Sequence, residues 1–181
     1  MRADTLAATI EELAESGYPS LTLDAVARRA GVHKTTLYRR WGTREALVLE
    51  AMLSLVDERV PVPDTGSLRE DLLALATAAA ATAGTPAGEA VVRAVVAAGP
   101  HDEALAEAND RFWTERLALD GAIVERAVAR GEVAPGTDPR TVIEAVLGPL
   151  YFRRLVTGSP PDREFVERIV DLVAMGSSSK A

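Results

Sequence analysis

The chain contains no cysteine among its 181 residues. Disulfide-stabilised scaffolds, cysteine-ligated zinc fingers and thiol catalysis are therefore excluded together. It also has no run of about 18 uncharged apolar residues, which a membrane-spanning helix would need. The first residues, Met1–Asp4, lack the apolar segment of a secretory signal. We therefore expect a protein of the cytoplasm.

Side chains that commonly carry catalysis are also scarce. The chain has only two histidines, His33 inside a basic segment and His101 directly after Pro100. Catalysis needs a nucleophile, a base and oxyanion donors that converge on one point. The sequence shows no metal-ligand spacing, no glycine-rich phosphate loop and no nucleophile elbow. We therefore expect neither an enzyme nor a bound metal or cofactor.

The net charge of −7 hides a local reversal of sign. From Pro61 to the C-terminus the chain has 12 basic and 18 acidic residues, whereas the segment from Arg28 to Arg44 has six basic residues and no acidic one. The six are Arg28, Arg29, Lys34, Arg39, Arg40 and Arg44. A basic patch on an acidic chain is typical of a protein that contacts nucleic-acid phosphates with one face. The alternative is a basic helix face that is simply solvated.

Proline and glycine divide the chain into helical segments, and the period-2 alternation of strands is nearly absent. The spacing of apolar residues predicts an all-α fold of about nine helices and no sheet. The expected helices cover residues 3–16, 22–30, 31–40, 42–60, 67–83, 86–98, 102–130, 139–157 and 162–175. Pro149 should kink the helix that contains it, because proline lacks the backbone donor.

The segment from Leu23 to Trp41 has the spacing of a helix-turn-helix. Ala27 provides a small contact where two short helices cross, and Gly31 can adopt the left-handed turn conformation at little steric cost. Val26, Val32 and Leu37 are expected to point inward and fix the second helix against the first. The basic, hydroxyl-rich helix that follows the turn has the composition of a major-groove recognition helix.

Nine residues of this region are candidates for DNA contact. They are Thr22, His33, Lys34, Thr35, Thr36, Tyr38, Arg39, Arg40 and Arg44. Lys34 can donate to guanine O6 or N7, and Thr35 or Thr36 can offer a hydroxyl to a base edge or a methyl to thymine. Thr22, Tyr38, Arg39, Arg40 and Arg44 are expected mainly to hold the phosphate backbone.

Several of these residues also have plain structural interpretations. His33 can be no more than an N-cap, and the ring of Tyr38 can simply pack on the domain. Trp41 is expected in the core rather than at the DNA. Arg28 and Arg29 are expected on a solvated face of the supporting helix.

Two helices near the C-terminus are apolar on more than one face. This breadth predicts burial on both sides and hence a subunit interface, and Ala145 and Gly148 would allow close approach of another helix. The expected interface residues are Val142, Ala145, Val146, Gly148, Phe165, Ile169 and Leu172. The alternative is a helix that is central to a monomer.

The long helix expected over residues 102–130 contains Phe112, Trp113 and Arg116. An adjacent Phe-Trp pair in a chain with few aromatic residues can mark a small-molecule pocket, although core packing is the competing interpretation. Most other candidate lining residues are Ala, Val and Leu, so a pocket here would be largely apolar.

From about Thr5 to Leu55 the sequence resembles the tetracycline-repressor (TetR) family of bacterial regulators. The motif residues are Thr22, Ala27, Ala-Gly-Val at 30–32, Leu-Tyr at 37–38, Trp41 and a basic residue at 44. The sequence departs from the family at His33, where a small capping residue is usual, and at Arg44, where lysine is common. Residues 130–133 and 148–158 resemble a C-terminal domain found in the same family.

The resemblance implies an all-helical homodimer whose last two long helices form a four-helix bundle with the partner. It further implies that the central helices enclose a pocket whose small-molecule ligand changes the spacing of the two DNA-reading heads. We therefore expect a helix-turn-helix DNA-binding domain over residues 1–60, a ligand-binding and dimerisation domain over 61–176 and a flexible tail over 177–181. The expected partners are double-stranded DNA, a second copy of the chain and a small-molecule effector.

The expected function is a homodimeric repressor that binds a palindromic operator and is released by a small apolar ligand. The alternative is a constitutive DNA-binding regulator or adaptor without such a ligand.

Overall fold

The computed structural model describes residues 1–98 and 103–178, without the side chains of residues 94–98 and 105. The described residues form nine α-helices and contain no strand beyond an isolated antiparallel bridge between Val133 and Ser178. The all-α prediction is therefore confirmed, including the number of helices. No helix in the described part of the chain is long and apolar enough to cross a membrane.

The chain forms two compact units. The N-terminal unit contains Met1–Glu58 together with Thr82–Trp113, and the C-terminal unit contains Arg59–Ala81 together with Thr114–Ala181. Each unit is thus built from two separate stretches of the sequence. Helical periodicity reveals single helices but not which of them pack together, so the sequence did not show that residues 82–113 return to the first unit.

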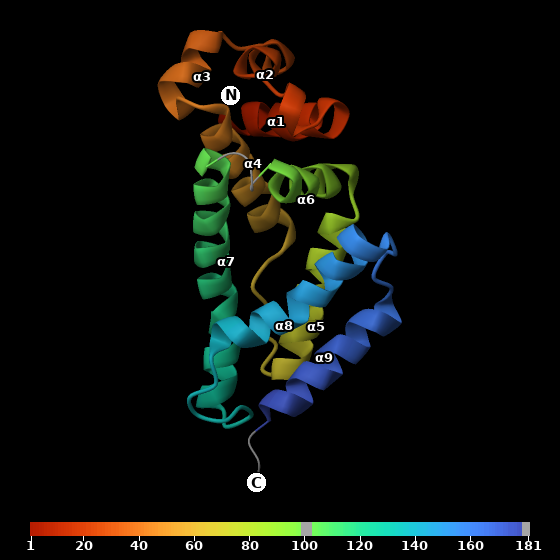
Figure 1. Cartoon of the computed structure of the whole chain (residues 1–181). Coiled ribbons are helices and arrows are strands. Elements are labelled where there is room, and N and C mark those ends of the chain that lie inside the picture. Colours follow the sequence, from red (N-terminus) through yellow and green to blue (C-terminus); the bar gives the residue numbers. More distant parts are fainter. Residues whose placement is uncertain (99–102, 179–181) are drawn as a thin grey trace. The chain divides into compact units, whose positions relative to one another are not determined.

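The N-terminal unit begins with α1 (Arg2–Ser16), the short 3-10 turn η1 (Tyr18–Ser20), α2 (Leu23–Ala30), α3 (Lys34–Trp41) and α4 (Arg44–Arg59). It also contains α6 (Pro86–Ala98) and the first part of α7 (Glu103–Ala129). Helix α1 packs against both α2 and α6, as Figure 1 shows. Its core gathers apolar side chains from all of these elements, among them Leu13, Leu21, Val26, Leu37, Leu47, Val91 and Phe112.

The C-terminal unit contains most of α5 (Leu68–Ala83), the second part of α7, α8 (Pro139–Phe152), the π-helical turn η3 (Arg153–Thr157) and α9 (Arg163–Ser177). Helix α8 packs along α9. Asp138 and Asp162 begin these two helices by accepting hydrogen bonds from first-turn backbone amides, such as the 2.8 Å bond from the Phe165 amide to Asp162. The fully buried side chains include Leu72, Leu75, Ile123, Val124 and Ile143.

Two details of the C-terminal helices differ from the sequence prediction. The helix expected to run to Thr157 is α-helical only to Phe152 and continues as the π-helical turn η3, a change that follows Pro149 by one turn. Helix α9 extends to Ser177, and Ser178 pairs with Val133, so the domain boundary expected at residue 176 falls inside α9. The remaining tail residues and Asp102 lie outside the described residues.

Candidate nucleic-acid interface

Helices α2 and α3 form the helix-turn-helix that the sequence predicts. The Thr22 hydroxyl accepts a hydrogen bond from the Ala25 amide at 3.1 Å and so caps α2. Gly31 ends α2 with φ +66°, the left-handed conformation that glycine adopts without strain. The Val32 amide then donates to the Ala27 carbonyl at 3.0 Å and closes the turn. These contacts fix the direction in which α3 leaves the turn.

Helix α3 has one buried and one exposed face. Leu37 and Trp41 are buried in the core of the N-terminal unit, which confirms the core assignment of Trp41. The exposed residues of α3 and its N-cap are His33, Lys34, Thr35, Tyr38, Arg39 and Arg40, and Thr36 is half-buried. A helix of eight residues thus presents a polar and basic surface whose orientation is set by its buried side chains.

Two structural alternatives for this helix can be compared with the geometry. His33 occupies the N-cap position in extended conformation, but its side chain makes no capping hydrogen bond, and it is exposed. Tyr38 is 52% exposed, so its ring is not a core side chain. Both residues therefore have surface available for a partner of this helix.

The basic residues of the segment differ in how much of their charge is already paired. Arg29 bonds to Glu12 at 2.9 Å and is also ion-paired with Glu15 and Glu11 of α1, contacts that raise its pKa further above the ordinary value. Arg29 is exposed, as expected, and these ion pairs in addition connect it to α1. Arg28 is exposed, as expected.

Lys34 forms an ion pair of 3.3 Å with Asp24 in the first turn of α2. Both side chains are largely exposed, so this pair is accessible to solvent and to an approaching anion. The contact shows that the first turns of α2 and α3 meet. Asp24 was not identified from the sequence as a partner of Lys34. The expected crossing of the two helices, which brings their first turns together, could have indicated it.

Arg44 lies in the first turn of α4 and is held from three sides. Its guanidinium stacks 4.5 Å above the Tyr18 ring, bonds to Glu45 at 2.7 Å and approaches the Leu21 carbonyl at 3.5 Å. Tyr18 also donates its hydroxyl to Glu45 at 3.0 Å. Arg44 is one-third exposed, so a preorganised cation faces solvent beside the recognition helix. The contact between Tyr18 and Glu45 could not be predicted from the sequence, because it joins residues 27 positions apart.

Glu50 of α4 joins α1 to the end of α3. It accepts hydrogen bonds from Arg2 and from the Trp41 indole, each at 2.5 Å. Burial alone would raise the pKa of Glu50, but these two donors outweigh it and hold the pKa below its ordinary value. Nothing in the local sequence pattern indicated this cluster.

The three candidate ligand residues lie in different environments. Phe112 is buried in the core of the N-terminal unit, and Trp113 meets it edge to face with ring centroids 5.0 Å apart. Arg116 is buried in the C-terminal unit, where it bonds twice to Asp120, at 2.7 and 2.9 Å, and to the Val60 carbonyl at 2.7 Å. Burial raises the pKa of Asp120 above its ordinary value, because it outweighs the lowering effect of the Arg116 guanidinium. Phe112 and Trp113 thus contact each other, whereas Arg116, one turn further along α7, bonds to Asp120 and to the Val60 carbonyl.

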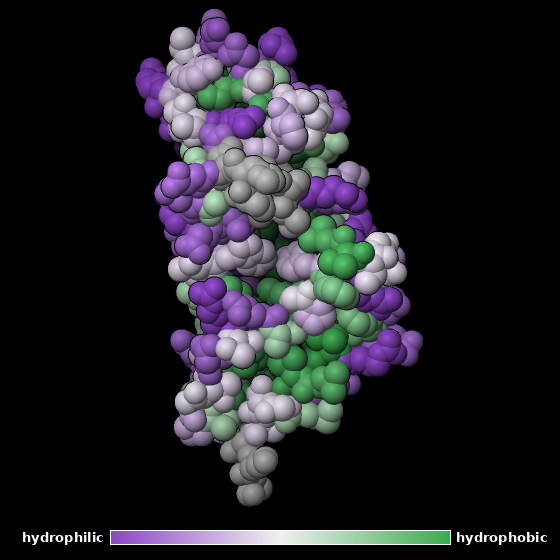
Figure 2. Space-filling model, in the orientation of Figure 1, coloured by the Kyte–Doolittle hydropathy of each residue, from purple (hydrophilic) through white to green (hydrophobic). Residues whose placement is uncertain are grey.

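The candidate interface residues divide into buried and accessible sets. Val142 and Val146 are buried within the chain itself, so their side chains are already covered. Ala145, Gly148 and Leu172 are exposed, and Phe165 and Ile169 are half-buried. Figure 2 shows hydrophobic residues gathered on the face of the C-terminal unit where α8 and α9 lie in Figure 1. Phe152, Val156, Leu172 and Met175 are the large apolar residues that α8, η3 and α9 leave more than half exposed.

No group of three or more His, Cys, Asp or Glu side chains in the described part of the chain could hold a metal ion.

Comparisons with known proteins find matches for both the N-terminal and the C-terminal part of the chain. Residues 6–51 match a family model described as bacterial regulatory proteins, tetR family, and residues 62–173 match a tetracyclin repressor-like C-terminal domain. The regulator AqdR of Rhodococcus erythropolis is 35% identical, with 97% of this chain and 84% of AqdR covered. The DNA-binding transcriptional repressor TetR of Mycobacteroides abscessus is 35% identical, with 96% of this chain and 91% of the repressor covered.

A similar solved structure is that of the TetR family transcription regulator SCO0332. It has a TM-score of 0.82 and 33% sequence identity, and 98% of each chain is covered. The similarity therefore extends over both units of the chain and is not limited to the helix-turn-helix.

Proposed function

Because this chain belongs to the TetR family of bacterial DNA-binding transcriptional regulators, we propose that it is a homodimeric repressor that reads a palindromic operator with α3. The members of the family to which it is related are regulators and not enzymes. A regulator of this kind acts where the chromosome is, and we place it in the cytoplasm.

The observation that carries the proposal is the exposed basic face of α3. Leu37 and Trp41 anchor the helix from below, so Lys34, Thr35 and Thr36 at its N-terminal end are directed away from the core. In a helix-turn-helix this end enters the major groove, where an ammonium group can read guanine and a threonine can read thymine. We assign these three residues, with His33, to the base edges.

The remaining candidates surround this group and suit the phosphate backbone. Tyr38, Arg39 and Arg40 are exposed on α3, and Thr22 is exposed at the start of α2. Arg44 offers a guanidinium whose orientation is already fixed by Tyr18 and Glu45. A preorganised cation loses less side-chain entropy on binding, which suits a phosphate clamp.

The exposed apolar face of α8, η3 and α9 supports the homodimer. Large apolar patches on one chain mark interaction surfaces, and a two-fold dimer presents two recognition helices to two half-sites. Ala145, Gly148, Phe165, Ile169 and Leu172 remain accessible for such an interface, whereas Val142 and Val146 would support it from beneath.

The proposed release by a small apolar ligand extends the family's mechanism to this chain. The candidate ligand residues are Arg116, which is buried in the C-terminal unit in an ion pair with Asp120, and Phe112 and Trp113, whose rings meet edge to face in the N-terminal unit. A ligand acts only through unequal affinity for the DNA-competent and the released state. The second candidate, a regulator without a ligand, requires no such coupling.

The decisive experiment measures binding to the promoter DNA that flanks the chain's own gene. We expect an inverted repeat in that DNA to be protected from nuclease digestion, with an affinity at least about 1,000-fold above that for random duplex. Equal affinity for both duplexes would contradict the proposal. A thermal-shift screen then separates the two candidates, because a specific ligand raises the melting temperature by mass action.

A further inference from the structure

The N-terminal unit contains a cavity of about 550 Å³ that the DNA-reading surface does not use. We propose that it is a second effector site, which binds a small organic acid with an apolar body and controls the phosphate contact of Arg44. This inference rests on the proposed function, since it concerns the regulation of DNA binding.

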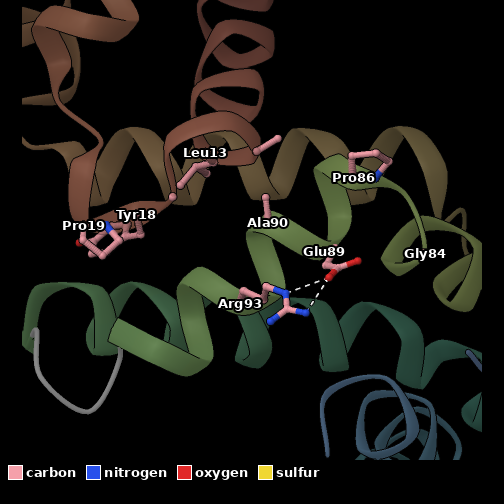
Figure 3. Close-up of a pocket in the computed structure, with 10 residues that line it drawn as sticks. Leu13, Tyr18, Pro19, Gly84, Pro86, Glu89, Ala90 and Arg93 are labelled. Atoms are coloured by element: carbon pink, nitrogen blue, oxygen red, sulfur yellow. Dashed lines mark hydrogen bonds and ion pairs between the residues drawn. The ribbon is translucent and has the colours of Figure 1, made fainter. Parts of the chain in front are cut away.

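The cavity lies between the end of α1, η1 and the start of α6, as Figure 3 shows. Its walls come from stretches that are far apart in sequence but belong to the same compact unit. The lining residues are Leu13, Ala14, Gly17, Tyr18, Pro19, Gly84, Pro86, Glu89, Ala90 and Arg93. A volume of this size falls within the range of small-molecule sites, roughly 300 to 1,000 Å³.

The lining indicates the chemistry of the occupant. Leucine, alanine and proline side chains and a tyrosine ring supply most of the wall, so the body of the occupant must be apolar. The charged groups at the wall are Glu89 and Arg93 of α6, paired at 2.8 and 2.9 Å. Arg93 is 69% exposed, and a guanidinium has more donors than the two nitrogens that Glu89 engages. An acidic group on the occupant can therefore pair with Arg93.

Tyr18 connects this cavity to the DNA-reading surface. One side of Tyr18 lines the cavity, its ring supports the Arg44 guanidinium at 4.5 Å, and its hydroxyl holds Glu45. Glu45 in turn bonds to Arg44 at 2.7 Å. An occupant that displaces Tyr18 removes the ring beneath the Arg44 guanidinium and the hydroxyl that orients Glu45, and so weakens two of the three contacts that hold Arg44. We therefore expect occupancy to weaken DNA binding through the loss of a preorganised phosphate contact.

Because the chain has no cysteine, a single introduced cysteine can be modified selectively. Ala90→Cys places one thiol in the cavity wall, and benzyl methanethiosulfonate converts it to a mixed disulfide that carries an apolar ring. Ser16→Cys is the matched control, since Ser16 is exposed at the end of α1 and does not line the cavity. Both variants are made in the full chain, and 2-naphthoate serves as the reversible probe.

We expect 2-naphthoate to slow the modification of Cys at position 90 saturably, and not at position 16. We expect the benzylated A90C chain to bind operator DNA about tenfold more weakly, with the slope of log affinity against log salt reduced by about 0.9, the value of one phosphate contact. The benzylated S16C chain should bind like wild type. Circular dichroism and thermal melting of each chain test whether it remains folded.

Unchanged modification rates in the presence of 2-naphthoate, or wild-type DNA affinity after benzylation at position 90, would overturn the second site. These outcomes are distinct from failure of the proposed function. If the proposed function were wrong, the unmodified wild-type and A90C chains would show no preference for the operator over random DNA.

Discussion

The basic residues between Arg28 and Arg44 are not equivalent, although the sequence presents them as one patch. Arg29 is engaged by three carboxylates of α1 and serves the packing of α2 on α1. Lys34 forms an ion pair with the partly exposed Asp24, and Arg44 is held by Tyr18 and Glu45 with one-third of its side chain exposed. A count of charges therefore overstates the number of cations that can meet DNA.

Lys34→Ala tests base reading. We expect the discrimination between operator and random duplex to fall by about 1–3 kcal/mol, because one base-edge contact is lost. Fluorescence anisotropy with both duplexes measures it, and Arg28→Ala is the control from a neighbouring exposed position. A uniform weakening on both duplexes would make Lys34 a phosphate contact instead.

Arg44→Ala tests the phosphate clamp. Affinity should fall for every DNA sequence, and the salt slope should drop by about 0.9, since one counterion-releasing contact disappears. Titrations at several salt concentrations give the slope. Arg44→Lys keeps the charge but loses the planar stack on Tyr18, so it should retain the slope and recover only part of the affinity. An unaltered slope in Arg44→Ala would count against the clamp.

Glu50 makes the stability of the N-terminal unit depend on pH in the acidic range. Because its folded pKa lies below the ordinary value of 4.5, its stabilisation is complete above that value and is lost as the pH falls through the folded pKa. Glu50→Gln should lower the free energy of unfolding at neutral pH and make its decline below about pH 4.5 shallower. Urea unfolding at a series of pH values measures both effects. If the free energy of unfolding of the variant declined with pH as in the wild type, Glu50 would not be the source of the pH dependence.

At the scale of the helical elements, the turn between α2 and α3 depends on one backbone conformation. Gly31→Ala meets no atom within 4 Å of the added methyl group, so only the positive φ opposes it. We expect a loss of about 1 kcal/mol of stability and weaker DNA binding. Gly176→Ala in α9 also meets open space but has no positive φ, and should not destabilise the chain. Equal thermal shifts in the two variants would contradict this account.

The helices themselves could be predicted because local rules determine them. Gly31 turns the chain as the sequence pattern indicated, and the all-α class follows from periodicity. What could not be predicted depends on contacts between distant segments. The supports of Arg44 and Glu50, and the return of α6 to α1, are set by tertiary packing, which leaves no mark on spacing within one helix.

The candidate sites show the same division. The surface of α3 could be predicted residue by residue, since a buried Leu37 fixes which side chains face outward. The apolar residues on more than one face of α8 indicated burial on two sides, but they did not show which valines face the chain's own core. The structure assigns Val142 and Val146 to that core and leaves Leu172 outside it.

At the scale of the whole molecule, the proposed dimer depends on the exposed apolar face of α8, η3 and α9. Leu172→Glu should weaken association by at least about 2 kcal/mol, because it introduces an unpaired charge where burial is expected. Sedimentation at micromolar concentration should show a dimer for the wild type and a monomer for the variant. Leu119→Glu changes another exposed leucine of the C-terminal unit, on α7, and should remain dimeric. A monomeric wild type would exclude the dimer.

The two-segment construction of the N-terminal unit has a consequence for synthesis on the ribosome. Val91 and Phe112 belong to the same core as Leu13, Val26 and Leu37, so the unit lacks part of its interior until those residues emerge. The helices that carry the DNA-reading surface are made first, but their packing is completed only after α5, α6 and the part of α7 that contains Phe112 have left the exit tunnel. A nascent chain can thus acquire its affinity for DNA only late in translation.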